Sequence, residues 1–296
     1  MVTPRFLAAA LALALVLGAL AAYAHEEGPE AAAAHEEEND GAASPAGTAD
    51  LALTLKHRAF LGIAVLGTLA LIIVLLAIKL DGDTGVHHAS ERLKWALFLG
   101  IVVPVLLATA YSAGTTIYLN TISESEGPVH WHADFEVWNC GEQLELEDPI
   151  GMSNRVGTAL FHEHNDNRIH VEGVVVDTGD VSLHHFFETI GGELRGGMFR
   201  VPTHGGDVTA PDGKLCNGQP GKVQVFVYKV TNPDERGSWD VRQRKIQDVG
   251  DYVLAPYGQV PPGDCIIVEF DAEKETTDRL CSSYRAAQQR GELRGG

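Results

Sequence analysis

Five histidines of this chain fall at strand-like spacings in two short stretches. His130 and His132 lie in HWHADFEVW, and His162, His164 and His170 lie in LFHEHNDNRIHVEGVVV. Alternate residues of a strand point to the same face with Cα atoms about 6.6 Å apart, and rotamer choice lets two such imidazoles reach one metal ion. Neutral imidazole suits zinc, copper, iron or nickel. We therefore predict a transition-metal site, for copper or zinc, with one or more of the five histidines left outside the coordination sphere.

Acidic side chains accompany these histidines and could complete the coordination or orient the imidazoles. The candidates are Asp134, Glu136, Asp166 and Glu172. A single His-x-His pair would favour ordinary polar surface, but two pairs together with a further histidine favour a common site. The other histidines are assigned to solvent-facing positions (His184, His185, His204), to an acidic tail (His25, His35) and to membrane flanks (His57, His87, His88).

Period-two alternation from residue 127 onward predicts the strands that would hold the site. In HWHADFEVW the odd-numbered residues from Trp131 to Val137 are apolar, whereas His130 and His132 fall on the opposite face. One face of this strand is therefore expected to pack in a core while the other presents ligands.

We expect turns near the site at 139–141 and 165–167. A short helix is predicted over 183–190, capped by Asp180 or Ser182. The stretches KVQVFVYKV and DCIIVEF predict further strands, and a last helix is expected from Asp271 to about Gln289. We therefore predict an α+β domain, rich in β structure and with short helices, over residues 127–290.

The four cysteines all lie in this domain. Four cysteines allow three pairings. We favour Cys265 with Cys281, which would join the last strand to the last helix and leave Cys140 with Cys216. Disulfides persist in oxidising compartments, so the cysteines favour an exported domain.

Two apolar segments are long enough to cross a hydrocarbon core of about 30 Å: 58–80, with an uncharged run from Ala59 to Ile78, and 95–119. Residues 1–24 are typical of a signal peptide or an anchor helix, and the small residues around Tyr23 fit a cleavage site. Residues 25–57 are rich in Glu, Ala and Gly without apolar periodicity and predict an acidic disordered tail.

The orientation follows from the loop at 81–94, which carries Arg92 and Lys94 and is expected in the cytoplasm. The C-terminal domain then lies outside the cytoplasm at the cell membrane, where membrane lipid and other membrane or cell-surface proteins are the expected partners. The chain has 22 Lys and Arg against 40 Asp and Glu, a net charge of −18, so nucleic acid is excluded as a partner because phosphate contacts need basic patches.

The strings HWHADFEVWNCGEQLEL, LFHEHNDNRIHVEG, LHHFFETIGG and PPGDCIIVEF resemble an uncharacterised family of exported or membrane-anchored prokaryotic proteins. The resemblance covers about residues 128–285. It implies that the five histidines form one constellation, and it brings neither an activity nor the identity of a metal.

Two better-known metal sites fit less well. Cupins use His-x-His-x3-Glu, a spacing that His130, His132 and Glu136 match, but a later segment with the second cupin histidine is missing. Subunit II of haem–copper oxidases also has two membrane helices before a β domain, but its copper site needs two cysteines four residues apart, whereas Cys265 and Cys281 lie much farther apart.

Three functions are consistent with the sequence. The first is a membrane-anchored protein that binds a transition metal through the histidines. The second is a metal-dependent enzyme in which Glu136, Glu163 or Glu172 acts as general base on a metal-bound water. The third is a cell-surface structural or interaction module without metal, whose histidines are polar surface. Convergence of the five imidazoles would favour the first two over the third.

Overall fold

The computed structural model describes residues 47–84, 91–147, 149, 154–233, 237–249, 252–254 and 263–295. The predicted signal or anchor segment at 1–24, most of the predicted tail and four histidines (His25, His35, His87, His88) lie outside these residues. The chain divides into two compact units, Met1–Ile122 and Ser123–Gly296.

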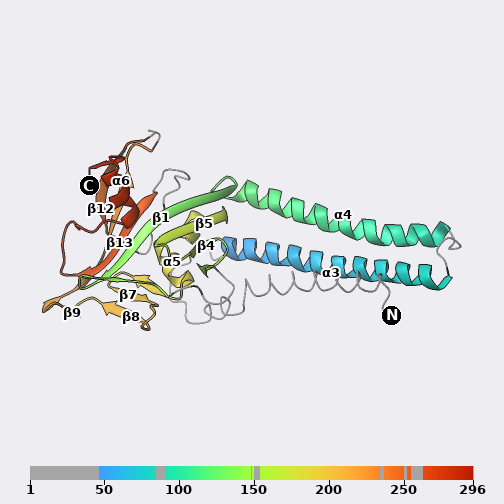
Figure 1. Ribbon diagram of the computed structural model, residues 1–296, viewed down its shortest axis with the longest axis horizontal. Coiled ribbons are helices and arrows are strands. Elements are labelled where there is room, and N and C mark those ends of the chain that lie inside the picture. The colour runs from blue at the N-terminus through green and yellow to red at the C-terminus, as the bar shows by residue number, and fades with distance from the viewer. Residues whose placement is uncertain are drawn as a thin grey trace. The chain divides into compact units, whose positions relative to one another are not determined.

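The first unit contains two long apolar helices that run side by side (Figure 1). They are α3 (Gly47–Thr84) and α4 (Glu91–Ile122). Their apolar stretches, Thr54–Lys79 and Glu91–Ile122, are long and apolar enough to cross a membrane by length and composition. Gly100 of α4 permits a close approach, because a Cβ there would lie 3.1 Å from the Ile73 side chain of α3.

Both helices are longer than the predicted spans. α3 begins at Gly47 instead of residue 58, so residues 47–57 are helical and their assignment to a disordered tail is wrong. The segment is rich in Ala, Leu and Thr and lacks Gly or Pro after its first residue, so nothing in it stops the helix. Hydropathy marks the part of a helix that fits the hydrocarbon layer, whereas the helix itself continues into polar flanking residues.

The second unit is built on a nine-stranded sheet with the order β14-β12-β11-β13-β1-β5-β4-β3, to which β2 adds by pairing with β1. The strands are β1 (Pro128–Asn139), β2 (Glu142–Leu144), β3 (Val156–Gly157), β4 (Phe161–Glu163), β5 (Arg168–Val174), β11 (Lys222–Val230), β12 (Trp239–Ile246), β13 (Asp264–Asp271) and β14 (Leu293–Gly295). β1 is the central connector, since it pairs in parallel with β13 along one part and antiparallel with β5 along another.

Smaller elements flank this sheet. A three-stranded sheet contains β6 (Glu193–Arg195), β7 (Met198–Val201) and β8 (Val208–Pro211), and a two-stranded one contains β9 (Leu215–Cys216) and β10 (Gln219–Pro220). The helices of this unit are the 3₁₀ helix η2 (Thr178–Val181), α5 (Leu183–Thr189) and α6 (Ser282–Gln289). The prediction of a β-rich domain with short helices after two long apolar helices is confirmed.

The main core lies on the face of the large sheet that α5 covers. Ser182 caps α5 by accepting a hydrogen bond from the His185 amide, as the sequence predicts. Phe186 of α5 contacts Phe135 of β1 and Phe161 of β4, with ring centroids 5.0 and 5.5 Å apart. The predicted apolar face of β1, from Trp131 to Val137, is buried in this core.

A second, smaller core lies on the opposite face of the sheet, where Tyr284 and Ala287 of α6 pack on Phe226 and Ile267. Only part of this face is covered by α6. His130 and His132 belong to the same face, because residues of β1 alternate and Glu136 pairs with Ile267 of this second core.

The last helix differs from its prediction. α6 begins at Ser282, not at Asp271, because the segment before it is held in an extended path by side chains of the sheet: the Lys274 and Thr277 amides donate to Gln224 and Gln243. After α6 the chain continues into β14, so the domain extends beyond the predicted end at residue 290.

Both disulfides follow the pairing that we favoured. Cys140 is bonded to Cys216 and Cys265 to Cys281, with Cα–Cα distances of 5.3 and 5.8 Å. The second bond joins β13 to the start of α6, so it ties the helix to the sheet face that also carries the histidines.

Candidate metal centre

Three histidines lie opposite one another on three adjacent strands. In the antiparallel register His132 of β1 pairs with His170 of β5, and His170 pairs on its other side with His162 of β4. Residues that pair in this way point to the same face with Cβ atoms about 4.5–5.5 Å apart. The fold therefore places three imidazoles in one row across the sheet.

The other two histidines extend this row. His130 precedes His132 by two residues on β1, and its ring centroid lies 4.5 Å from that of His132. His164 follows β4 and lies 4.8 Å from both His162 and His170, measured between ring centroids. All five predicted ligands are thus brought together on one face.

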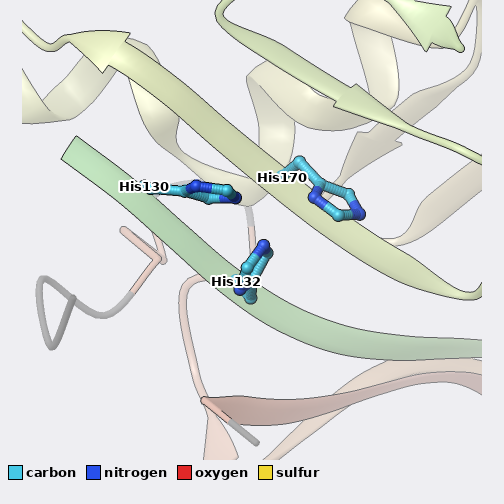
Figure 2. A group of neighbouring side chains, drawn as sticks. All are labelled: His130, His132 and His170. Atoms are coloured by element: carbon cyan, nitrogen blue, oxygen red, sulfur yellow. The ribbon is translucent and has the colours of Figure 1, made fainter. Parts of the chain in front are cut away.

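The nitrogen atoms form two groups of possible ligands. His130, His132 and His170 make the first group, and His162, His164 and His170 make the second; within each group the ligand atoms lie within 4.8 Å of one another. Figure 2 shows the first group, with the three rings on the same side of β1 and β5. Such spacing allows small rotamer changes to close a metal site.

Exposure falls from the first group to the second. The side chain of His130 is 59% exposed, whereas His170 and His162 are 9% and 1% exposed as residues. His132 and His164 are intermediate. The cluster thus runs from solvent at His130 into the domain at His162.

Hydrogen bonds leave several ring nitrogens available. His164 donates its Nδ1 proton to the Asn154 carbonyl, which fixes the ring and leaves the Nε2 lone pair free. The buried Nδ1 atoms of His162 and His170 have no hydrogen-bond partner among the described residues. Buried polar nitrogens normally find partners, so these lone pairs favour a ligand that the side chains share.

Two of the four predicted carboxylates contact the histidines. Glu172 pairs with His130 on the neighbouring strand, and its Oε1 lies 3.1 Å from His130 Nε2. Asp166 accepts a hydrogen bond from His170 Nε2 at 3.3 Å. Both contacts orient imidazoles, as carboxylates beside metal sites do.

Asp134 and Glu136, the other predicted carboxylates, are bound to arginines instead. Asp134 Oδ1 accepts from Arg168 Nε at 2.7 Å, and Glu136 Oε1 accepts from Arg285 of α6 at 3.2 Å. The Glu136 carboxylate also accepts from Trp138 Nε1. Glu136 is therefore engaged under α6, and neither group of ligand atoms contains it, so the cupin-like use of Glu136 as a ligand finds no support.

Burial keeps the imidazoles neutral. Removal from water, followed by repulsion from His170 and His130, lowers the pKa of His132 from 6.5 to about 4. Removal from water and the neighbouring His164 lower the pKa of His162 to about 4, and burial also lowers the pKa of His170. Neutral imidazole is the form that binds metal, so these histidines need not first lose an imidazolium proton at neutral pH.

The histidines outside the cluster have different surroundings. Both ring nitrogens of His184 are hydrogen-bonded, to Glu188 Oε1 at 3.1 Å and to the Leu194 carbonyl at 2.9 Å. The hydrogen bond to Glu188 raises the pKa of His184, which favours the charged ring. His185 contacts Ser182 through Nδ1. Both residues are half-buried, not fully solvent-facing as predicted, and neither belongs to either group of ligand atoms.

Among the three candidate general bases, Glu172 alone contacts the cluster. Glu136 is bound to Arg285, and Glu163, between His162 and His164, points to the other face of β4 and is 1% exposed. A cavity of about 770 Å³ lies elsewhere, over β12 and α6, and is lined by Gln243, Thr277 and Tyr284 without any of the five histidines.

Two residues that support the cluster were not predicted. Asn154 holds His164 through its main-chain carbonyl. Every residue type has this group, so the identity of residue 154 could not predict the contact. Gly263 has φ +79°, and a Cβ there would lie 2.2 Å from the His132 carbonyl oxygen. Its place in PPGDC predicts a turn but not this approach to β1.

Comparisons of the chain with family models, with curated proteins and with solved structures found no match. The family resemblance of the motifs stays a prediction.

Proposed function

We propose that this chain is a membrane-anchored protein whose extracytoplasmic domain binds a transition metal, copper or zinc, through the histidine cluster. The single observation that carries the proposal is the convergence of five imidazoles from β1, β4 and β5 on one sheet face, in two groups with ligand atoms within 4.8 Å.

A polar surface without metal explains this arrangement poorly. Burying a ring nitrogen without a hydrogen bond costs about 1–3 kcal/mol. His162 and His170 each bury Nδ1 in this way, and their rings stack 5.4 Å apart. A metal ion would use the lone pairs that are otherwise left without partners.

The ligand types favour copper or zinc. Imidazoles are typical ligands of both metals, whereas magnesium and calcium prefer oxygen ligands. All four cysteines are held in disulfides, so no thiolate competes for the metal in this domain. Asp166 and Glu172 supply negative charge beside the imidazoles.

Features of both units support the proposed localisation at the membrane. The two apolar helices suit a bilayer, with membrane lipid as their partner, and Arg92 and Lys94 at the start of α4 favour the cytoplasm for that end of the helix. Two disulfides suit an oxidising compartment for the second unit. Other membrane or cell-surface proteins are further partners under this proposal, and nucleic acid is not one.

The test is metal analysis of the full chain, purified in detergent and equilibrated with Zn²⁺ or with Cu²⁺. We expect stoichiometric metal in the unaltered chain and at least a tenfold loss of affinity in His162→Ala and in His164→Ala, because each removes a ligand. His184→Ala is the matched control, since it removes a histidine that is already hydrogen-bonded at both nitrogens. Unchanged stoichiometry and affinity in both ligand variants would overturn the proposal.

A further inference from the structure

The five histidines divide into two sets of ligand atoms instead of one, and this division has a consequence for how much metal is bound. Among the described residues, the nitrogens of His130 and His132 group with His170, and those of His162 and His164 also group with His170. The two outer pairs do not form a group with each other. A single ion therefore fits one outer pair or the other, and His170 is the common member.

The central position of His170 comes from the sheet. β5 lies between β1 and β4, so His170 has His132 on one side and His162 on the other. Its ring centroid lies 4.7 Å from that of His132, 5.4 Å from that of His162 and 4.8 Å from that of His164. No other histidine of the cluster is paired in register with histidines on both neighbouring strands.

The two ring nitrogens of His170 face different neighbours. Nδ1 lies 3.9 Å from Glu172 Oε1, the oxygen that lies 3.1 Å from His130 Nε2. Nε2 lies 3.3 Å from Asp166 Oδ2, two residues after His164 in the turn between β4 and β5. In Figure 2 one nitrogen of His170 is turned toward His130 and the other away from it. The ring thus offers one nitrogen to each group.

We infer that the cluster binds two transition-metal ions, one in each histidine group, with His170 bridging them through its two ring nitrogens. This inference rests on the proposed function. Each ion receives three imidazole nitrogens, a number of protein ligands that leaves one tetrahedral position for a carboxylate or solvent. A neutral imidazole carries one ring proton, so binding of the second ion displaces that proton from His170 to solvent.

Charge supports two ions instead of one. Glu172 contacts His130 of the first group and Asp166 contacts His170, which both groups share, so two carboxylates offset part of the charge of two ions. The bridging imidazolate adds a further negative charge between the ions, which lowers the repulsion between two dications.

The first experiment measures stoichiometry on the full chain in detergent, by Zn²⁺ titration and metal analysis. We expect two ions per chain for the unaltered protein, one for the double variant His130→Ala/His132→Ala and one for His162→Ala/His164→Ala. His170→Ala should weaken both sites at least tenfold, while His184→Ala should keep two ions. Thermal unfolding of every variant identifies any that fails to fold.

The second experiment uses Cu²⁺ and electron paramagnetic resonance, because an imidazolate bridge couples the two copper spins. The signal should grow with the first equivalent and fall with the second, and each double variant should give the full signal of one uncoupled copper. One ion per chain, lost in only one double variant, would leave the proposed function standing and overturn the two-ion inference. Two uncoupled ions would overturn the bridge, and no bound metal would overturn both proposals.

Discussion

His170 shows how burial prepares a histidine to bind metal. It is only 9% exposed, its Nδ1 has no hydrogen-bond partner among the described residues, and Asp166 holds its Nε2. Burial disfavours the charged ring, so the pKa of His170 is lowered. Burial leaves Nδ1 of His170 without a partner in the described part of the chain, which is costly, but it also keeps the ring neutral. The neutral ring is the form that binds a metal ion.

The lowered pKa values of His132 and His162 predict how the metal-free domain responds to acid. Both drop from 6.5 to about 4 in the fold. Between these values the unfolded chain binds more protons than the folded domain, so the free energy of unfolding increases with pH. This stability is fully present above about pH 6.5 and is lost as the pH falls toward about 4. Thermal unfolding in EDTA, followed by tryptophan fluorescence from pH 7.5 to 4.5, measures it.

Two variants separate this effect from the general titration of carboxylates. His162→Gln should flatten the decline between pH 6.5 and 4.5, because it removes one of the two groups. His184→Gln should steepen it, since the raised pKa of His184 contributes stability at acid pH with the opposite sign. A decline with the same slope in His162→Gln as in the unaltered chain would contradict the assignment.

The pairing of strands, not the motifs themselves, decides which histidines meet. Alternation in HWHADFEVW correctly predicted the two faces of β1. The turn predicted at 165–167 lies between the paired strands β4 and β5, where Asn165 and Asn167 adopt positive φ. The sequence could not predict that β1 pairs with β5, since register between distant strands depends on the whole core. That register alone brings His132 opposite His170.

Long-range contacts also explain the errors. Asp134 and Glu136 share a face with the histidines, as predicted, but Arg168 and Arg285 reach them from other elements and occupy their carboxylates. The prediction that a helix begins at Asp271 is wrong because Gln224 and Gln243, on other strands, accept hydrogen bonds from main-chain amides that follow Asp271. The local sequence pattern predicted which face of a strand each residue lies on. Partners from other elements determined which carboxylates remained available to the histidine cluster.

The approach of Gly263 to β1 gives a test of how strand placement supports the cluster. Gly263→Ala would bring a Cβ within 2.2 Å of the His132 carbonyl oxygen, so β1 or the start of β13 must shift. We expect a loss of stability beyond the about 1–3 kcal/mol of positive-φ strain, together with weaker Zn²⁺ binding. Denaturant unfolding and Zn²⁺ titration of the full chain measure both quantities.

Gly213→Ala is the matched control for this variant. Gly213 has φ +84°, close to that of Gly263, but a Cβ there meets nothing within 4 Å. It should therefore show the backbone strain alone and bind Zn²⁺ like the unaltered chain. Equal effects of the two substitutions on metal binding would show that the contact with His132 does not support the site.

In the whole molecule, the two apolar helices and the histidine domain are consistent with the single orientation that we propose. Arg92 and Lys94 lie in the first turn of α4 and favour the cytoplasm for that end of the helix, and a chain that crosses the bilayer at α4 then emerges on the opposite side. The domain that follows contains two disulfides, which persist in an oxidising compartment. Basic residues at the start of α4 and cysteines after the helix thus support the same topology for independent physical reasons.

Cysteine labelling in intact cells tests this topology. All described cysteines are in disulfides, so an added cysteine is the reactive one under non-reducing conditions. Arg195→Cys lies on an exposed side chain of β6, and Glu91→Cys on an exposed side chain at the start of α4. A membrane-impermeant maleimide should label Arg195→Cys in intact cells and Glu91→Cys only after permeabilisation. Labelling of both in intact cells would contradict a crossing at α4. Labelling in the reverse order would invert the orientation and place the cluster where the cytoplasm, not the cell exterior, supplies its metal.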